Sequence, residues 1–219
     1  TTRDEDFIEY MFTATTHNFL LLFTEKGRCY WIKVYDIPEG SKTGKGRAIQ
    51  NLLQMPSDDK VMAFIPVLNL KEEEYLDNNY LLFVTALGTI KKTSLRAYSN
   101  VRSAGVNAIT IREEDKLERV VMTDGNSEVI IGTTKGQAIR FEEGKVRSMW
   151  RTATGVRGVT LQGDEDHVVG IISATEENRA TGTMLVLSEN GYGKRTFIDD
   201  PETGDPIYRR TNRGGKGVR

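Results

Sequence analysis

The chain has 219 residues, 30 basic and 31 acidic side chains and a formal net charge of −1, and 38% of its residues are hydrophobic. This composition is typical of a folded globular protein and excludes a disordered tail. No apolar run approaches the roughly 20 residues of a membrane helix and no secretory signal opens the chain, so we expect neither membrane insertion nor secretion. Cys29 is the only cysteine, which excludes a disulfide framework and favours a reducing, cytoplasmic setting.

In chain order, the first 18 residues contain one apolar run at residues 7–12, which we expect to be the last strand of a preceding unit. Beyond it a short pattern recurs four times: an apolar strand, a Ser or Thr, two variable residues and a Gly. The hydroxyl group can close a turn onto the backbone and the Gly can adopt a positive φ, so each copy predicts a β-hairpin. The four copies are residues 24–27, 85–88, 133–136 and 188–191.

Two other landmarks recur with the hairpins. A glycine-marked bend predicts entry into a third strand, and the bends are at Gly46, Gly105, Gly155 and Gly217. An aspartate before a longer apolar run predicts a further strand, and these aspartates are Asp6, Asp59, Asp115 and Asp166.

Each unit therefore holds about four short strands in roughly 50–60 residues, and no stretch shows a sustained helical period. The sequence predicts an all-β fold, a propeller-like array of four-stranded antiparallel blades. After residues 1–18, the expected repeats are 19–79, 80–127, 128–182 and a truncated 183–219. We expect the chain to be a fragment of a longer array, with about four blades' worth of sequence.

The charges are segregated within the repeat. Residues 26–50, 88–112, 135–160 and 191–219 run from each hairpin glycine through the bend, and together they hold 24 basic and 8 acidic side chains. The segments between them, 51–79, 113–128 and 161–190, hold 5 basic and 18 acidic side chains. Because the segregation recurs in each repeat, we expect the basic segments to lie along one edge, which is what a nucleic-acid backbone needs.

Glycines beside these cations expose backbone amides and let a phosphate approach closely. No repeated surface aromatic alternates with the cations, so gripping of duplex DNA by its phosphates is favoured over stacking on single strands. The candidate DNA-binding residues are Lys42, Lys45, Arg47, Lys91, Lys92, Arg96, Arg102, Arg140, Arg147, Arg151, Arg157, Lys194, Arg195, Arg210, Arg213, Lys216 and Arg219.

Several segments resemble one known family. They are DEDFIEYMF at 4–12, KVYDIPEG at 33–40, GRAIQNLL at 46–53, ATGVRGVTL at 153–161 and SENGYGKR at 188–195. They are similar to the C-terminal domain of the A subunit of bacterial DNA gyrase, a β-pinwheel of usually six blades. That family carries a basic heptapeptide box, Gln-Arg-Arg-Gly-Gly-Lys-Gly, just before the segment with which this chain opens. The close variant TNRGGKG at 211–217 supplies a box-like loop of Arg213, Gly214, Gly215, Lys216 and Gly217.

The resemblance implies a domain that wraps duplex DNA without sequence specificity around a basic rim and supports ATP-dependent negative supercoiling by a type II topoisomerase, an isomerase. It implies no catalytic residue, metal or cofactor in this segment, because DNA cleavage belongs to the N-terminal part of the same gyrase chain, while ATP and magnesium are used elsewhere. The implied partners are duplex DNA, that N-terminal part and the gyrase B subunit in an A2B2 holoenzyme. The fragment itself is expected to be monomeric and to work at the bacterial nucleoid, in the cytoplasm.

Two other functions stay open. The equivalent domain of topoisomerase IV shares the blades, although the box-like loop favours gyrase. A protein-binding propeller of the WD40 or kelch type is the other, but these repeats are longer and lack those signatures. Catalytic motifs are not indicated, because GSKTGKG at 40–46 lacks the spacing of a phosphate loop and neither His17 nor His167 has paired metal ligands.

Overall fold

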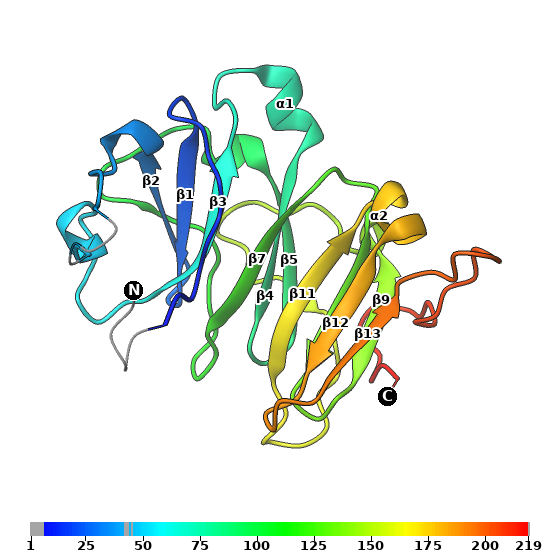
Figure 1. The fold of residues 1–219 in the computed structure, drawn as a ribbon. Coiled ribbons are helices and arrows are strands. Elements are labelled where there is room, and N and C mark those ends of the chain that lie inside the picture. The colour runs from blue at the N-terminus through cyan, green and yellow to red at the C-terminus, as the bar shows by residue number, and fades with distance from the viewer. Residues whose placement is uncertain (1–6, 42–43, 45, 219) are drawn as a thin grey trace.

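A computed structural model describes residues 7–41, 44 and 46–218. Its strands form four sheets that stand side by side like blades, with the hairpins at one end and the two short helices at the other (Figure 1). The strands are β1 (Phe19–Thr24), β2 (Arg28–Lys33), β3 (Val61–Val67), β4 (Tyr80–Thr85), β5 (Thr89–Ser94), β6 (Val106–Asn107), β7 (Leu117–Thr123), β8 (Glu128–Thr133), β9 (Ala138–Glu142), β10 (Val156–Arg157), β11 (Val168–Ala174), β12 (Thr183–Leu187) and β13 (Gly193–Phe197). The helices are α1 (Glu73–Asn78) and α2 (Glu176–Thr181), with 3₁₀ turns η1 (Val34–Asp36), η2 (Ile49–Asn51), η3 (Leu95–Tyr98) and η4 (Glu143–Lys145).

All four predicted hairpins are confirmed, and the turn chemistry is the expected one. Gly27, Gly88, Gly136 and Gly191 have φ between 74° and 85°. Each glycine N–H donates to the carbonyl of the hydroxyl residue three positions before it, at 2.9–3.0 Å. The hydroxyl oxygen accepts a backbone N–H in three of the hairpins, whereas that of Thr133 has no hydrogen-bond partner among the described residues.

The repeated aspartates accept hydrogen bonds from the backbone of the same hairpins. One carboxylate oxygen of Asp59, Asp115 and Asp166 accepts the backbone N–H of the third hairpin residue, at 3.0–3.2 Å. The acidic turns therefore lie at the hairpin end of the molecule because they cap the turns there.

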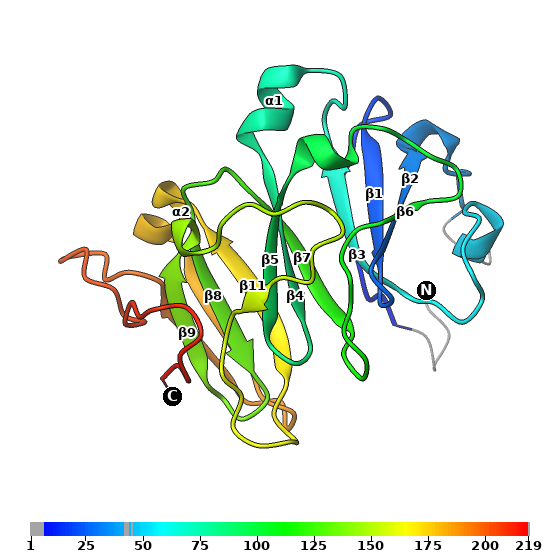
Figure 2. The same cartoon turned by 180° about the vertical axis from the view of Figure 1, so that it is seen from behind.

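In the first two sheets, one edge strand comes from the following repeat. The sheet orders are β3-β1-β2-β6 and β10-β5-β4-β7, so β6 completes the first sheet and β10 the second. In the third sheet, order β11-β8-β9, Val218 forms an isolated bridge with Ala138 at the same edge. Figure 2 shows these connecting segments crossing the back of the molecule from one sheet to the one before it. A contiguous repeat therefore does not form a contiguous sheet.

The apolar runs are continuous because both faces of the central strands are covered. In β4, Leu81 and Phe83 pack in the core between the first and second sheets, while Leu82 and Val84 pack in the core between the second and third. Phe23 contacts Phe83 edge to face, with ring centroids 5.2 Å apart. The strands β3, β7 and β11 lie next to one another along the side opposite the exchanged strands.

Two expected strands are absent from the described residues. Residues 7–18 contain no strand; instead, the Tyr10 hydroxyl donates to the Met62 carbonyl at 2.9 Å and the Phe12 ring stacks on Phe64. The segment after Gly46 forms η2 and not a strand, because the other bends pair with a preceding hairpin and residues 7–18 contain none. No helix in the described ranges has the length and hydropathy to cross a bilayer.

The exchange of strands between repeats can be tested at Gly155, which has φ +106° at the entry to β10. A Cβ atom there would lie 2.6 Å from the Ile90 carbonyl oxygen, so Gly155→Ala should lower the free energy of unfolding by about 2–4 kcal/mol. Gly144→Ala is the control, because its Cβ would meet nothing and its φ is not positive, and it should change stability by less than about 0.5 kcal/mol. Equal urea midpoints for the two variants would contradict the assigned exchange.

Candidate nucleic-acid interface

Three loops of the same form lead into the exchanged strands. We call residues 99–105, 149–155 and 211–217 the strap loops; each ends in a glycine of positive φ, and the third is the box-like loop. The second and third begin alike, because Met149 donates its N–H to the Lys92 carbonyl at 2.8 Å and Thr211 donates its N–H to the Arg140 carbonyl at 2.7 Å.

Each later strap loop rests on the strand and turn that follow the earlier one. Arg151 Nη1 donates to the Asn107 carbonyl at 3.1 Å, and Arg213 Nη1 repeats this bond to the Arg157 carbonyl at 2.5 Å. The Thr110 hydroxyl donates to the Thr152 carbonyl at 2.7 Å, and the hydroxyl of Thr160 repeats that bond one blade later. The strap loops therefore form a continuous, hydrogen-bonded row along the exchanged-strand edge.

The structure places the 17 predicted cations in different surroundings. Seven are exposed and form no ion pair with any residue that the structure describes: Arg47, Arg102, Arg147, Arg157, Lys194, Arg195 and Lys216. Arg96 and Arg210 are exposed but paired, with Asp77 and Glu128 respectively. Arg151 and Arg213 are partly buried and donate to carbonyls of the exchanged strands β6 and β10, whereas Lys42, Lys45 and Arg219 lie outside the described residues.

Lys91, Lys92 and Arg140 are buried, and the expectation that they lie on the rim is wrong. Lys91 Nζ donates to the carbonyl of Ala108, which follows β6, and to that of Arg151 in the second strap loop. Both faces of β5 and β9 are covered by neighbouring blades, so a cation inside these strands points into the protein and not toward solvent. Their apolar cross-strand partners, Phe83, Leu82 and Ile130, are the sequence signal of that burial.

In the first three hairpins, the fourth position after the glycine links one blade to the next. Trp31 Nε1 donates to the Tyr98 carbonyl at 2.9 Å, and Lys92 Nζ lies 3.3 Å from Glu143 Oε1. Arg140 donates to the Ile198 carbonyl at 3.0 Å. The sequence interpretation treated these positions as basic surface, but their shared feature is a donor that reaches the next blade.

Arg140 sits in a buried ionic cluster. Its guanidinium pairs with Glu128, and its Nη2 lies 2.7 Å from Asp199 Oδ1, an ion pair without hydrogen-bond geometry. Arg179 and Arg210 pair with the same Glu128. Burial raises the pKa of Glu128, but the hydrogen bonds from Arg140 and Arg210 outweigh it and hold that pKa below its ordinary value.

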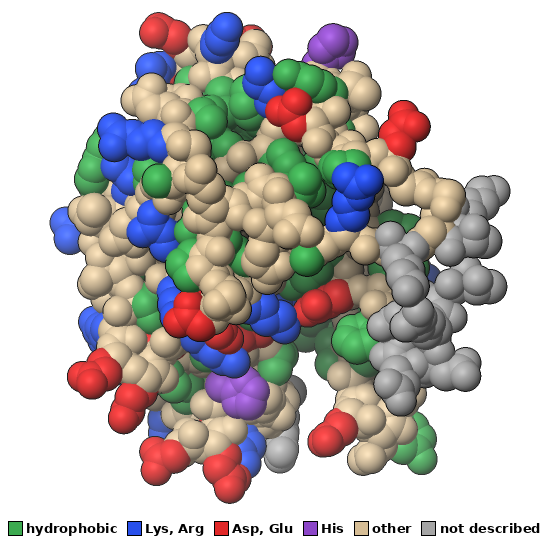
Figure 3. Space-filling view, turned by 90° about the vertical axis from the view of Figure 1, so that its left-hand side faces the viewer, with side chains coloured by type: hydrophobic (Ala, Val, Ile, Leu, Met, Phe, Trp, Pro, Cys, Tyr) green, Lys and Arg blue, Asp and Glu red, His purple; other side chains and the backbone are tan. Residues whose placement is uncertain are grey.

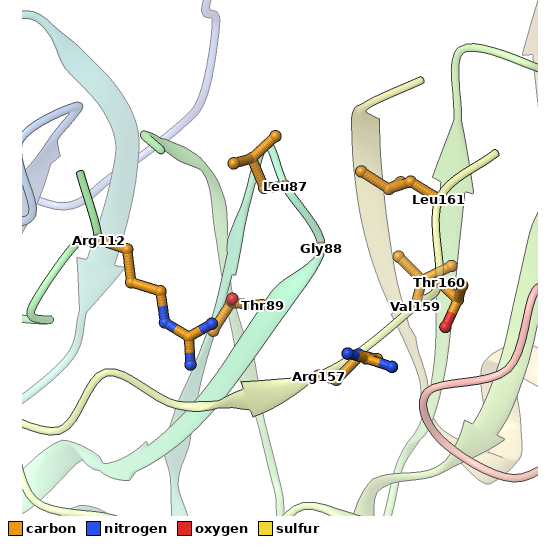
Figure 4. A pocket seen from close by; sticks show the side chains of 8 residues that line it. All are labelled: Leu87, Gly88, Thr89, Arg112, Arg157, Val159, Thr160 and Leu161. Atoms are coloured by element: carbon orange, nitrogen blue, oxygen red, sulfur yellow. The ribbon is translucent and has the colours of Figure 1, made fainter. Parts of the chain in front are cut away.

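A notch of about 390 Å³ lies beside the second hairpin, between the segments that follow two successive strap loops. Figure 4 shows Arg112 reaching in from one side toward Thr89, with Arg157 below and Val159, Thr160 and Leu161 opposite. Arg112 and Arg157 are exposed and have no ion-pair partner in the described part of the chain. Two guanidinium groups and a hydroxyl beside an apolar wall suit a phosphate and its sugar.

Arg112 was missed as a candidate, as were Lys145 and Arg209, which are also exposed. The signal for Arg112 was its place two residues after Thr110, a residue whose strap contact recurs at Thr160. In Figure 3, basic side chains lie along the left-hand border, and acidic side chains occur at the bottom, the hairpin end, and also at the top. The described residues contain no group of three acidic, His or Cys side chains able to hold a metal ion.

A family model described as "DNA gyrase C-terminal domain, beta-propeller" matches residues 18–76, 79–124, 127–175 and 183–200. The chain belongs to the DNA gyrase C-terminal domain family. It is 42% identical over 201 residues to the DNA gyrase A protein of Salmonella typhimurium, covering 92% of this chain and 22% of that protein. It is 40% identical to the Staphylococcus epidermidis counterpart, covering 100% of this chain and 23% of that one. The chain thus spans less than a quarter of these relatives.

Solved structures agree with the fold. The C-terminal domain of DNA topoisomerase IV matches with a TM-score of 0.75 at 28% identity, over 93% of this chain and 58% of that one. A DNA gyrase A C-terminal domain matches with a TM-score of 0.72 at 26% identity, over 94% of this chain and 60% of that one. The predicted all-β, propeller-like class is therefore confirmed.

Burial of Arg140 predicts a structural effect in place of a direct binding effect. Arg140→Met leaves two buried carboxylates without their central partner and should cost about 3–5 kcal/mol of unfolding free energy. Arg195→Met is the matched control at the same register position of the fourth hairpin, where the side chain is exposed, and should cost less than about 0.5 kcal/mol. A chemical denaturation series distinguishes them, and comparable costs would refute the buried-cluster role.

Lys91 predicts a pH dependence of stability. Burial, with a smaller contribution from Arg151, lowers its pKa from 10.5 to about 7. Between these two values the unfolded chain binds the proton and the folded chain does not, so stability should rise with pH, by up to about 1.4 kcal/mol per unit. The usable window is about pH 7–8.5, because the raised pKa values of Cys29 and Tyr98 oppose the trend at higher pH. Lys91→Met should flatten the slope in urea titrations, and an unchanged slope would contradict the assignment.

Proposed function

We propose that this domain binds and bends duplex DNA without sequence specificity along the row of strap loops. The supporting observation is the row itself: the second and third strap loops are each hydrogen-bonded to the exchanged strand that follows the strap loop before, and exposed cations such as Arg102, Arg112, Arg147 and Arg157 recur along or beside the row. Acidic side chains lie at both ends of the blades: Asp59, Asp115 and Asp166 cap the turns at the hairpin end, and α1 and α2 at the other end each begin with two glutamates. A rigid scaffold with one basic edge fixes the path of a phosphate backbone.

Bending is the part of the function that needs several blades. Curving 20–30 base pairs by 40–90° costs on the order of 1–6 kcal/mol, which contacts from one strap loop do not offset. Because the straps follow one another around the edge, a duplex that contacts each in turn is curved around the domain. Specificity should be slight, since phosphate contacts position a duplex and do not read bases.

Within a gyrase, the wrapped duplex would present a neighbouring segment of the same DNA to the cleavage gate and so favour negative supercoiling. In this proposal the domain is not catalytic itself, and its partners are the N-terminal part of the gyrase A protein and the gyrase B protein. Gyrase is favoured over topoisomerase IV because relatives at 39–42% identity are gyrase A proteins, whereas topoisomerase IV enters as a structural neighbour at 28%.

The backbone of the box-like loop is held in place, so the loop would present its exposed cation at a fixed position. Gly217 has φ +76° and its Cβ would meet the Ala138 carbonyl oxygen at 2.6 Å, while Gly214 donates its N–H to the Gly158 carbonyl at 2.8 Å. Arg213 is engaged with carbonyls, so Lys216, which is exposed, is the member we propose to contact phosphate.

Wrapping is tested by ligating nicked plasmid in the presence of the domain and resolving the topoisomers. A wrapping domain shifts the linking number in one direction with increasing protein. Titration of the domain with a short duplex at several salt concentrations gives the second measurement. Absence of binding at low salt would refute the proposal and leave a protein-binding propeller as the alternative.

The notch predicts which cations carry the salt dependence. Arg112→Gln and Arg157→Gln should each weaken binding to a duplex and reduce the slope of log K against log salt by about one unit, because each removes one phosphate contact. Lys71→Gln is the control, an exposed cation in an acidic segment, and should leave the slope unchanged. Equal effects of all three substitutions would show that the charge segregation has no bearing on binding.

A further inference from the structure

Trp150 is an aromatic side chain in the row of strap loops that we propose to bind phosphates. It is 65% exposed, whereas the other tryptophan, Trp31, is 8% exposed and hydrogen-bonded inside the protein. The segment around Trp150, residues 145–157, contains four basic side chains and no acidic one. The ring belongs to none of the hydrophobic core clusters in the described part of the chain.

The residue is held in a fixed place. Met149, before it, donates its N–H to the Lys92 carbonyl at 2.8 Å, and Ala153, after it, donates its N–H to the Trp150 carbonyl at 3.0 Å. The Arg151 guanidinium lies 6.0 Å from the centre of the Trp150 ring, and the bond to the Asn107 carbonyl anchors that arginine. Trp150 is therefore presented from a rigid turn and not from a mobile loop.

The other strap loops show what is unusual here. Trp150 is the second residue of its strap loop, and the second residues of the other two are Asn100 and Asn212, both exposed. The three positions are equivalent in the row, so a duplex that follows the row passes all three. Two of them offer a small amide and one offers an indole ring.

We propose that Trp150 contacts the wrapped duplex through its bases as an apolar wedge, partly inserted at a base-pair step in the minor groove, and so concentrates the bend at the middle strap loop. Apolar wedges of this kind unstack a step and kink a duplex, which reduces the smooth bending that the phosphate contacts must enforce. The cations on either side, Arg147 and Arg151, favour DNA over a protein partner. This inference rests on the proposed DNA wrapping and adds a contact that salt does not screen.

The test uses the chain as it stands and a short duplex with dyes at its two ends. Trp150→Ala should weaken binding about tenfold and reduce the energy transfer that reports the bend, while leaving the salt slope unchanged because no cation is lost. Trp150→Phe should keep most of both effects. Tyr35→Ala is the matched control, because Tyr35 is 62% exposed under the Lys33 ammonium but lies outside the strap loops, and it should change neither.

Fluorescence and sequence preference give two readouts that a purely structural residue would not move. Addition of DNA should change the emission of the exposed Trp150, and duplexes with a central TA step should be preferred over A-tracts by the unaltered chain but not by Trp150→Ala.

If the chain binds DNA and Trp150→Ala binds and bends it equally well, the wedge is wrong and the wrapping stands. If emission changes with protein concentration in the absence of DNA, the ring contacts a second copy and the wedge is again wrong. Failure of every variant, and of the unaltered chain, to bind DNA would overturn the wrapping itself.

Discussion

The exchange of the outermost strand between repeats is the constraint on which this fold depends. A four-stranded sheet here is three strands of one repeat and a short strand of the next, joined by a strap loop that must cross from blade to blade. The crossing leaves no room for a side chain at Gly105 or Gly155, whose Cβ atoms would lie within 2.6 Å of neighbouring atoms. It also places the strap loops, and the cations they carry, on one edge of the molecule.

The basic residues fall into a buried group and an exposed group, and the two groups have different roles. Lys92 and Arg140 hold adjacent blades together through the buried carboxylates of Glu143 and Asp199, whereas Arg112 and Arg157 stay in solvent beside the notch. A buried ion pair adds little net stability over an apolar contact, but it penalises any arrangement that leaves one partner alone. The inner cations therefore specify how blades meet, and the outer ones are available to a ligand.

The hairpins and their spacing were predictable because a hydroxyl residue and a glycine of positive φ determine a turn locally. The sheet that the outer strand joins was not predictable, since Val106 and Val156 pair through backbone hydrogen bonds, and nothing in their own sequence specifies the partner strand. The burial of Lys91 was not predictable from charge segregation either, because a count of charges along a segment does not distinguish a strand covered on both faces from a loop. The neighbouring apolar runs carried that information.

The exchange also sets an order in which the chain can finish folding. As the chain leaves the ribosome from its N-terminus, β1 and β2 can pair at once, but their sheet lacks its last strand until residues 106–107 have emerged. The second sheet waits in the same way for residues 156–157, and the edge of β9 for Val218. Each blade is therefore completed one repeat late, so during synthesis the most recent blade always exposes an unpaired edge, the feature by which growing chains associate wrongly with one another.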